Sequence, residues 1–196
     1  MTFKEMKYLI NSDIYRYHGR TNFSLFMKEF LWGTGSKFSI WLRISAYLRQ
    51  KGLPFFPFYL MARLFHRRNM FKFGMDIHCS TQIASGLYIG HFGTIVVSNR
   101  SIIGKNCNLS HGVTIGAIFY GPRSGAPVIG DNVYFGPGSK VIGNVTIGNN
   151  VAIGANCVVT HDVPENSVVV GIPEKIVSNK GSEGYILHTD YKSANM

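Results

Sequence analysis

The stretch "IGDNVYFGPGSKVIGNVTIGNNVAIGANCVV", residues 129–159, has a large apolar residue at every sixth position. Those positions are Ile129, Phe135, Val141, Ile147, Ile153 and Val159. A helical heptad would need apolar spacings of three and four, and an antiparallel meander would need turns every eight to twelve residues. The period of six instead predicts a parallel β-solenoid with three short faces per coil, in which stacked coils share one core.

The same period extends toward the N-terminus, with one change of phase. It runs through Ile77, Ile83, Ile89 and Ile95, then slips by two residues and resumes at Val97, Ile103, Leu109 and Ile115. We therefore expect a β-helix over residues 76–179, followed by a tail over residues 180–196.

Residues 1–75 differ from the repeat in composition. They hold 13 Lys and Arg residues and 3 Asp and Glu residues, whereas residues 76–196 hold 7 of each. The spacing of Phe38, Trp41, Ile44 and Leu48 predicts a helix over residues 36–51, and a second helix is expected over residues 58–68. The expected fold is thus mainly β, with an N-terminal α-helical region over residues 1–75.

Composition also bears on location and partners. Cys79, Cys107 and Cys157 are odd in number and widely spaced, which favours free thiols in a reducing, cytoplasmic compartment. The N-terminal "MTFKEMKYLINSD" lacks the apolar run of a secretory signal. Aromatic side chains mixed with Lys and Arg suit peripheral contact with an anionic membrane at its inner face. The sequence has no recognised reader motif for nucleic acid, so we expect no such partner.

Two histidines interrupt turns that otherwise hold mostly Gly, Asn and Ser. His91 and His111 each take the third place in their hexad and lie one full coil apart. They should share one corner of the prism at about 4.8 Å, and Pro137 and Ala155 should continue the same column. Asp76 is expected on that corner one coil below His91. An imidazole there suits a general base, and a carboxylate suits its orientation.

The motif "DIHCSTQIASGLYIGH", residues 76–91, places Asp76 fifteen residues before His91, and "VTIG" follows His111 after one glycine. This pattern resembles the hexapeptide-repeat acyltransferases, and within them the serine acetyltransferase-like subgroup that includes bacterial surface polysaccharide O-acetyltransferases. The resemblance implies a left-handed parallel β-helix, acetyl-CoA as co-substrate and catalytic His91 oriented by Asp76. It also implies a homotrimer with active sites between subunits.

The residues near His91 depart from those of serine acetyltransferases. Gly90 stands where those enzymes carry an aspartate, and Ala126–Pro127 stands where they carry His–Pro. A site that grips a small polar substrate through buried hydrogen bonds tolerates such losses poorly. The stretches "GLYIGHFGTIVV" and "GSEGYILHTDY" also resemble the polysaccharide enzymes. We therefore expect an O-acetyltransferase that acts on a bacterial surface glycan or its precursor.

Three other functions are open from the sequence. One is a serine O-acetyltransferase of cysteine biosynthesis. Another is a metal-dependent lyase on the same fold, which would need a third histidine beside His91 and His111 to hold zinc, and we expect no metal. The last is a non-catalytic scaffold, in which replacing His91 would leave any activity unchanged.

Further site residues are expected along the histidine column and on the loop that follows residue 116. The predicted substrate contacts are His111, Tyr120 and Arg123. The predicted acetyl-CoA contacts are small residues of the column and two lysines suited to phosphates, namely Gly136, Pro137, Lys140, Ala155 and Lys175.

Overall fold

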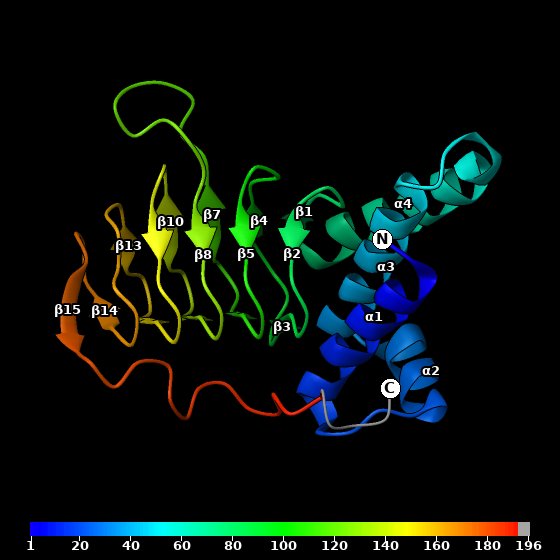
Figure 1. Ribbon diagram of the computed structural model, residues 1–196, viewed down its shortest axis with the longest axis horizontal. Coiled ribbons are helices and arrows are strands. Elements are labelled where there is room, and N and C mark those ends of the chain that lie inside the picture. The colour runs from blue at the N-terminus through cyan, green and yellow to red at the C-terminus, as the bar shows by residue number, and fades with distance from the viewer. Residues whose placement is uncertain (192–196) are drawn as a thin grey trace.

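The computed structural model describes residues 1–191 and shows a prism of stacked β-coils with a helical cap at one end (Figure 1). The last part of the expected tail, residues 192–196, lies outside the described residues. Three sheets form the sides of the prism, in the strand orders β1-β4-β7-β10-β13, β2-β5-β8-β11 and β3-β6-β9-β12-β14-β15. Paired strands within each sheet are parallel, except that β14 and β15 are antiparallel. The predicted fold class, a left-handed parallel β-helix with an N-terminal helical region, is confirmed.

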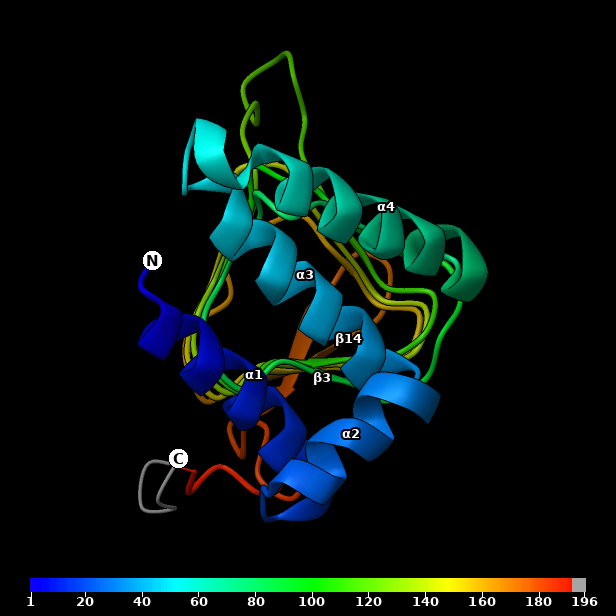
Figure 2. The same ribbon diagram turned by 90° about the vertical axis from the view of Figure 1, so that its right-hand side faces the viewer.

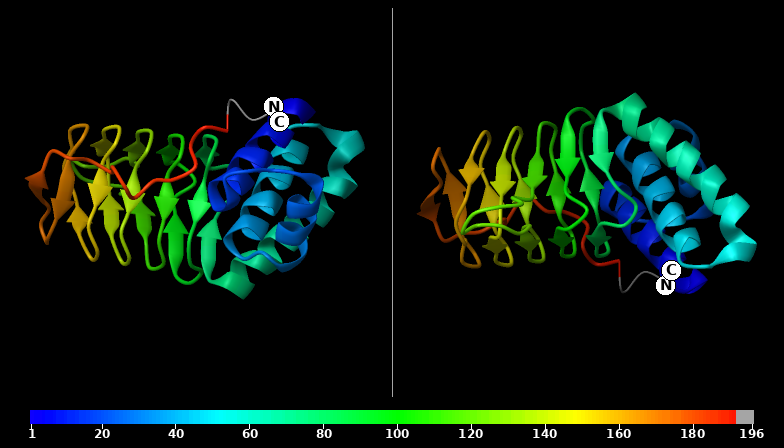
Figure 3. Two further views of the ribbon diagram at one scale, coloured as in Figure 1. Left: turned by 90° about the horizontal axis from the view of Figure 1, so that it is seen from below. Right: turned by 90° about the horizontal axis from the view of Figure 1, so that it is seen from above.

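The strands are short, two to four residues each. Their bounds are β1 Met75–Ile77, β2 Gln82–Ile83, β3 Tyr88–Ile89, β4 Ile95–Val97, β5 Ile102–Ile103, β6 Asn108–Leu109, β7 Thr114–Gly116, β8 Val128–Ile129, β9 Tyr134–Phe135, β10 Lys140–Ile142, β11 Thr146–Ile147, β12 Ala152–Ile153, β13 Val158–Val159, β14 Val168–Val170 and β15 Lys175–Ser178. Figure 3 shows the chain after β15 running back along the prism to the helices. There Tyr191 is buried, and its hydroxyl donates to Asn106 Oδ1 at 2.8 Å.

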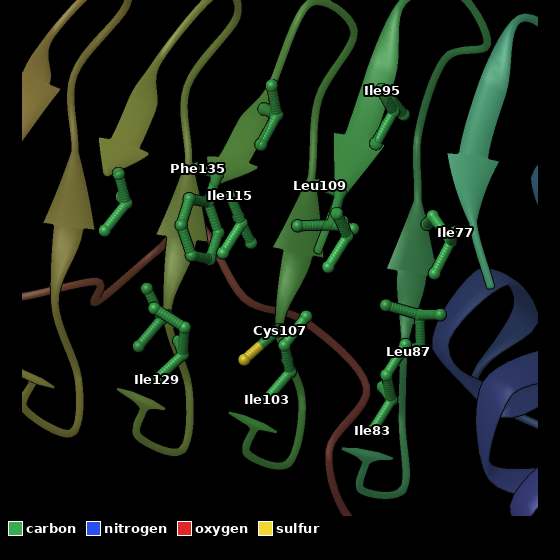
Figure 4. Packing of buried hydrophobic residues seen from close by; sticks show 14 of the residues in the cluster. Ile77, Ile83, Leu87, Ile95, Ile103, Cys107, Leu109, Ile115, Ile129 and Phe135 are labelled. Atoms are coloured by element: carbon green, nitrogen blue, oxygen red, sulfur yellow. The ribbon is translucent and has the colours of Figure 1, made fainter. Parts of the chain in front are cut away.

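The apolar residue of each hexad points into the prism. All fourteen aliphatic or aromatic residues of the period, from Ile77 to Val159, are buried in one continuous cluster (Figure 4). The residue four places later is also buried in most hexads, and at Cys107, Val133 and Cys157 it is completely enclosed. The exceptions, Gly93, Asn99 and Phe119, lie at the change of phase and in the loop after β7. Two inward side chains per hexad, stacked coil on coil, therefore supply the core.

An asparagine ladder runs along one corner of the prism. Asn106, Asn132, Asn150 and Asn166 all have positive φ, the left-handed conformation that asparagine tolerates well. Each side-chain amide donates to the next carbonyl oxygen, at 2.9 Å, 2.9 Å and 3.0 Å along the column. The ladder allows tight turns at this corner without a glycine at every coil.

Four α-helices cover the open end of the prism (Figure 2), and the inward side chains of the first coil, such as Met75 and Ile77, are buried beneath them. They are α1 Phe3–His18, α2 Phe23–Trp32, α3 Gly35–Arg49 and α4 Phe56–Phe73, with a short 3-10 helix at Leu53–Phe55. The predicted helices over 36–51 and 58–68 correspond to α3 and α4. Within residues 1–191, no helix combines the length and apolar content needed to cross a bilayer.

A buried ion pair fastens the helices to the first coils. Asp13 of α1 accepts hydrogen bonds from Arg43 of α3 at 3.0 Å and 3.2 Å, and from the amide of Leu87 at 2.8 Å. The Arg43 guanidinium also donates to the carbonyl oxygens of Ile83 and Ala84, each at 2.6 Å. These bonds satisfy carbonyl groups at the end of the prism, where no further coil is available to donate N–H groups to them.

Candidate active site

His91 and His111 lie on one corner of the prism, in the turns that lead into β4 and β7. Their ring centroids are 6.0 Å apart and the rings meet edge to face. Both side chains are exposed to solvent. Ile89 is in register with Leu109 and Val96 with Thr114, so the His91 turn holds two residues more than the His111 turn. These extra residues are the change of phase seen in the repeat, and they widen this turn.

The column above the histidines is made of small residues, as the hexad spacing predicts. The amide of Gly138 donates to the carbonyl oxygen of His111 at 2.9 Å, and the amide of Asn156 donates to that of Pro137 at 2.8 Å. Pro137 therefore sits on the coil next to His111, and Ala155 sits one coil further. The corner thus carries two imidazoles followed by a smooth strip without bulky side chains.

Asp76 does not lie on this corner, contrary to expectation. It is in register with Val96, five residues beyond His91 along the coil. The chain below the His91 turn is the end of α4 instead of another coil, since the amide of Gly93 donates to the carbonyl oxygen of Phe73 at 2.8 Å. Within the part of the chain described, neither Asp76 nor His91 forms a side-chain hydrogen bond or ion pair. The joint catalytic role of Asp76 and His91 stays a prediction.

Asp76 instead lines a cavity of about 480 Å³ between α4 and the first two strands of its sheet, β1 and β4. Arg63 and Arg67 of α4 line the same cavity, together with Thr94 and Val96. Thr94 lies three residues after His91, so the cavity begins close to the wide histidine turn. A carboxylate and two guanidinium groups therefore face a common space beside the corner.

The loop between β7 and β8 is closed by two backbone hydrogen bonds between Ile118 and Gly125, at 2.9 Å and 2.8 Å. Tyr120, at its tip, is 84% exposed. The loop leaves the corner between the sheet of β7 and the sheet of β8. The histidines lie at a different corner, between the sheet of β3 and the sheet of β4. Within one chain the structure therefore does not bring Tyr120 or Arg123 to His91.

Arg123 is held against a later coil by a network that the sequence did not reveal. Its guanidinium donates to the carbonyl oxygen of Thr160 at 3.0 Å and lies 2.6 Å from His161 Nε2. On its other side, His161 Nδ1 is 2.7 Å from Glu174. Burial opposes ionisation of Glu174, but hydrogen bonds from the backbone and from His161 outweigh it and lower the pKa of this carboxyl. Arg123, His161 and Glu174 become neighbours only when the coils stack, so no local motif indicates the network.

The predicted acetyl-CoA contacts are spread over the molecule. Gly136 is buried beside Pro137, and its amide donates to Ile153 at 2.8 Å, so it serves contact between coils. Lys140 is exposed on β10, where its Nζ donates to the carbonyl oxygen of Gly138 at 2.9 Å. Lys175 is exposed on β15, in a different sheet. The roles of all these residues toward a cofactor stay predictions.

No three His, Cys, Asp or Glu side chains of residues 1–191 lie close enough together to hold a metal ion. Two histidines outside the corner hold positions within the helical cap. His66 is fully buried in α4, and His18 pairs with Glu29 at 2.8 Å. The exposed imidazole pair at the corner is therefore the strongest chemical feature of the described surface.

Comparison with known proteins finds similar sequences and structures. The family model "Bacterial transferase hexapeptide (six repeats)" matches residues 126–161. The chain contains hexapeptide repeats and is similar to the serine acetyltransferases. The serine acetyltransferase of Synechococcus elongatus is 37% identical over 141 residues, which cover 71% of this chain and 55% of that protein. That of Staphylococcus xylosus is 43% identical over 123 residues, which cover 63% and 57% of the two chains.

A solved structure agrees with these relatives. The crystal structure of serine acetyltransferase in complex with coenzyme A from Brucella abortus has a TM-score of 0.75 and 28% identity, covering 91% of this chain and 70% of that one. The chain spans little more than half the length of the two relatives named above.

The expected glycan acceptor is contradicted by these findings. Both relatives and the solved structure are serine acetyltransferases, and nothing in the comparisons supports capsule or polysaccharide synthesis. That expectation rested on Gly90 and Ala126, which stand in place of polar family residues. Absent side chains show which contacts are missing, but they do not identify another acceptor.

Proposed function

We propose that this chain is an acetyl-CoA-dependent O-acetyltransferase whose acceptor is the hydroxyl of serine. The observation that carries the proposal is the exposed pair of His91 and His111, at 6.0 Å, on a corner of the β-helix. The similar proteins named above are serine acetyltransferases, one of them solved with coenzyme A. A smooth strip through Pro137 and Ala155 beside this pair suits the long, thin arm of a coenzyme A thioester.

In this proposal His91 is the general base. Its neutral imidazole accepts the proton of the acceptor hydroxyl as the oxygen attacks the acetyl carbonyl carbon. A new C–O ester bond forms, the C–S bond of the thioester breaks, and the proton held by His91 passes to the departing sulfur. His111 is close enough to contact the same substrate, because its ring meets that of His91 edge to face.

We further propose that each site forms between two chains, as in a homotrimer. The loop with Tyr120 and Arg123 and the corner with His91 leave different edges of one prism. The loop would therefore complete a site on a neighbouring copy. This arrangement would give the loop residues the substrate contacts predicted for them.

Gly90 bears on how firmly serine is held. It provides no carboxylate, and a Cβ placed there would lie 3.2 Å from Cε1 of Tyr88, so this ring occupies part of the space. Tyr88 itself packs against Tyr17, with ring centroids 4.6 Å apart and the rings tilted by 41°. We therefore expect turnover of serine with a high KM, because one family contact is missing and the neighbouring ring is held in place.

A cytoplasmic location is proposed as well. The cysteines Cys79, Cys107 and Cys157 are all free and buried. Free thiols are typical of a reducing compartment, where disulfides are rare.

The test is release of free thiol from acetyl-CoA by the full chain, with L-serine as acceptor and with no acceptor as background. We expect serine-dependent release that falls by a factor of about 10² to 10⁴ in His91→Ala, the usual contribution of a general base. His188→Ala is the matched control, because His188 lies in the C-terminal segment against Gly19, away from the proposed machinery. Absence of serine-dependent release, or full activity of His91→Ala, would refute the proposal.

A further inference from the structure

Helix α4 buries Ala62 and Phe73 against the fold, but it carries a second set of apolar side chains on the side that faces away from the protein. His66 and Asn69 are buried against the fold, while Leu60, Met61 and Leu64 are exposed. Leu64 is 68% exposed on the outward face. A helix that only covers the end of a prism would carry mainly polar side chains on its outward side. The apolar residues exposed on α4 indicate that this outward side contacts something apolar.

The apolar surface continues onto the segment before the helix. The 3-10 helix exposes Leu53 (87%) and Phe55, and the first turns of α4 expose Phe56 and Phe58. Figure 1 and the right view of Figure 3 show this segment projecting beyond the body of the protein at the capped end. We call the exposed apolar residues of these two helices the α4 patch: Leu53, Phe55, Phe56, Phe58, Leu60, Met61, Leu64, Phe65 and Phe71.

Positive charge surrounds the α4 patch. Residues 30–75 contain eight Lys and Arg residues and no Asp or Glu. Arg67, Arg68 and Lys72 are exposed on the C-terminal half of α4, and the Arg67 guanidinium lies 5.6 Å from the centre of the Phe71 ring. Across residues 1–191 none of these three cations forms an ion pair. Their charge is therefore available to an external anion.

We propose that the α4 patch docks the protein on the surface of an anionic lipid bilayer. The apolar side chains enter the boundary between headgroups and acyl chains, while the flanking cations remain at the level of the lipid phosphates. The helix lies in the plane of the interface and does not cross it. This inference concerns where the enzyme works and is independent of the acceptor proposed above.

Charge complementarity favours a bilayer over a second copy of the chain. A symmetric contact between two α4 patches would bring Arg67, Arg68 and Lys72 together with the same residues of the other copy. Residues 30–75 contain no carboxylate, and Asp76, which lines a cavity with Arg67, is a single negative charge per copy, so most of the positive charge at such a contact would not be neutralised. An anionic lipid surface provides both the apolar medium and the opposite charge.

The experiment is sedimentation of the full chain with vesicles of phosphatidylcholine alone, or with part of it replaced by phosphatidylglycerol. We expect binding to the anionic vesicles and little to the neutral ones. The triple variant Arg67→Gln, Arg68→Gln, Lys72→Gln should bind on the order of a hundredfold more weakly, at about fivefold per cation. Equal binding of the triple variant and the wild type would overturn the proposal.

A matched control removes three exposed cations elsewhere, in Lys4→Gln, Lys7→Gln, Arg20→Gln. It has the same net charge as the α4 triple variant and should keep most of the binding. If both triple variants weaken binding equally, only net charge matters and docking through the α4 patch is refuted.

The apolar half of the proposal is tested with Leu60→Ser, Leu64→Ser. These exposed positions can change without opening the core, and an unchanged melting temperature in free solution verifies folding. We expect reduced vesicle binding and an unchanged molecular mass by light scattering. If the variant instead dissociates a larger assembly while vesicle binding stays at wild-type level, a second copy covers the patch and the bilayer proposal is wrong.

Discussion

Acid should destabilise the fold through His66, and His66→Gln should remove that sensitivity. The side chain of His66 is fully buried in α4, with its ring centroid 5.0 Å from that of Phe38. Its Nε2 lies 3.0 Å from the carbonyl oxygen of Ile77, which makes Nε2 the protonated nitrogen of a neutral ring. Its Nδ1 is buried without a partner among residues 1–191. A second proton would therefore be buried with no acceptor.

Burial lowers the pKa of His66 from 6.5 to about 4, although the bond to Ile77 raises it in part, and the nearby charges of Arg63 and His78 lower it further. As pH falls below 6.5, the unfolded chain takes up this proton while the folded chain does not. The stabilisation by neutral His66 is complete above pH 6.5 and is lost as pH falls through 4. The difference of about 2.5 pKa units corresponds to about 3 kcal/mol between pH 7 and pH 4, at 1.36 kcal/mol per unit.

The assay is urea unfolding of wild type and His66→Gln at fixed protein concentration, at several pH values from 7 to 4. Glutamine retains an N–H that can donate to Ile77 and does not titrate in this range. Other groups that titrate in acid, such as Glu174, contribute to both proteins and cancel in the difference. We expect the free energy of unfolding to fall by about 3 kcal/mol more in the wild type. Parallel pH profiles of the two proteins would show that the pKa of His66 does not differ between the folded and the unfolded chain.

Two further predictions concern buried groups. Asp13→Ala should lower the free energy of unfolding by about 3–5 kcal/mol, because it leaves the buried Arg43 charge uncompensated; urea unfolding measures this, and a loss below about 1 kcal/mol would contradict it. Cys107 should not react with a thiol reagent in the folded protein, since it is completely enclosed and burial raises the pKa of its thiol to about 12. Rapid modification without denaturant, compared with the rate in urea, would show that the coils around it open.

Much of the β-helix could be predicted from the repeat, because the place of a residue within its hexad decides whether its side chain points into the prism. Ile103, Leu109 and Ile115 occupy the same place in successive hexads, and all three are buried. The same counting placed His91 and His111 on one corner. It failed for Asp76, since the chain before β1 is a helix and the two additional residues after β3 widen the turn. Hexad counting therefore holds along the stacked coils and fails at the residue where the helix joins the first coil.

Other features required the folded chain. Asp13 and Arg43 are thirty residues apart on different helices, and no periodicity links them. Arg123, His161 and Glu174 come from a loop, a turn and a C-terminal segment that meet only after the coils stack. The outward apolar face of α4 is equally invisible in the sequence, because an amphipathic pattern does not say which side is covered.

The sequence by itself determined the β-helix, the positions of its inward residues and the pairing of the two corner histidines. Each of these depends on a period that one coil imposes on the next, so local spacing is sufficient. Only the tertiary structure decided where Asp76 lies, what holds Arg123 and which face of α4 remains exposed. Those depend on contacts between segments far apart in the chain, where the buried area and the bonds available after folding select the neighbours.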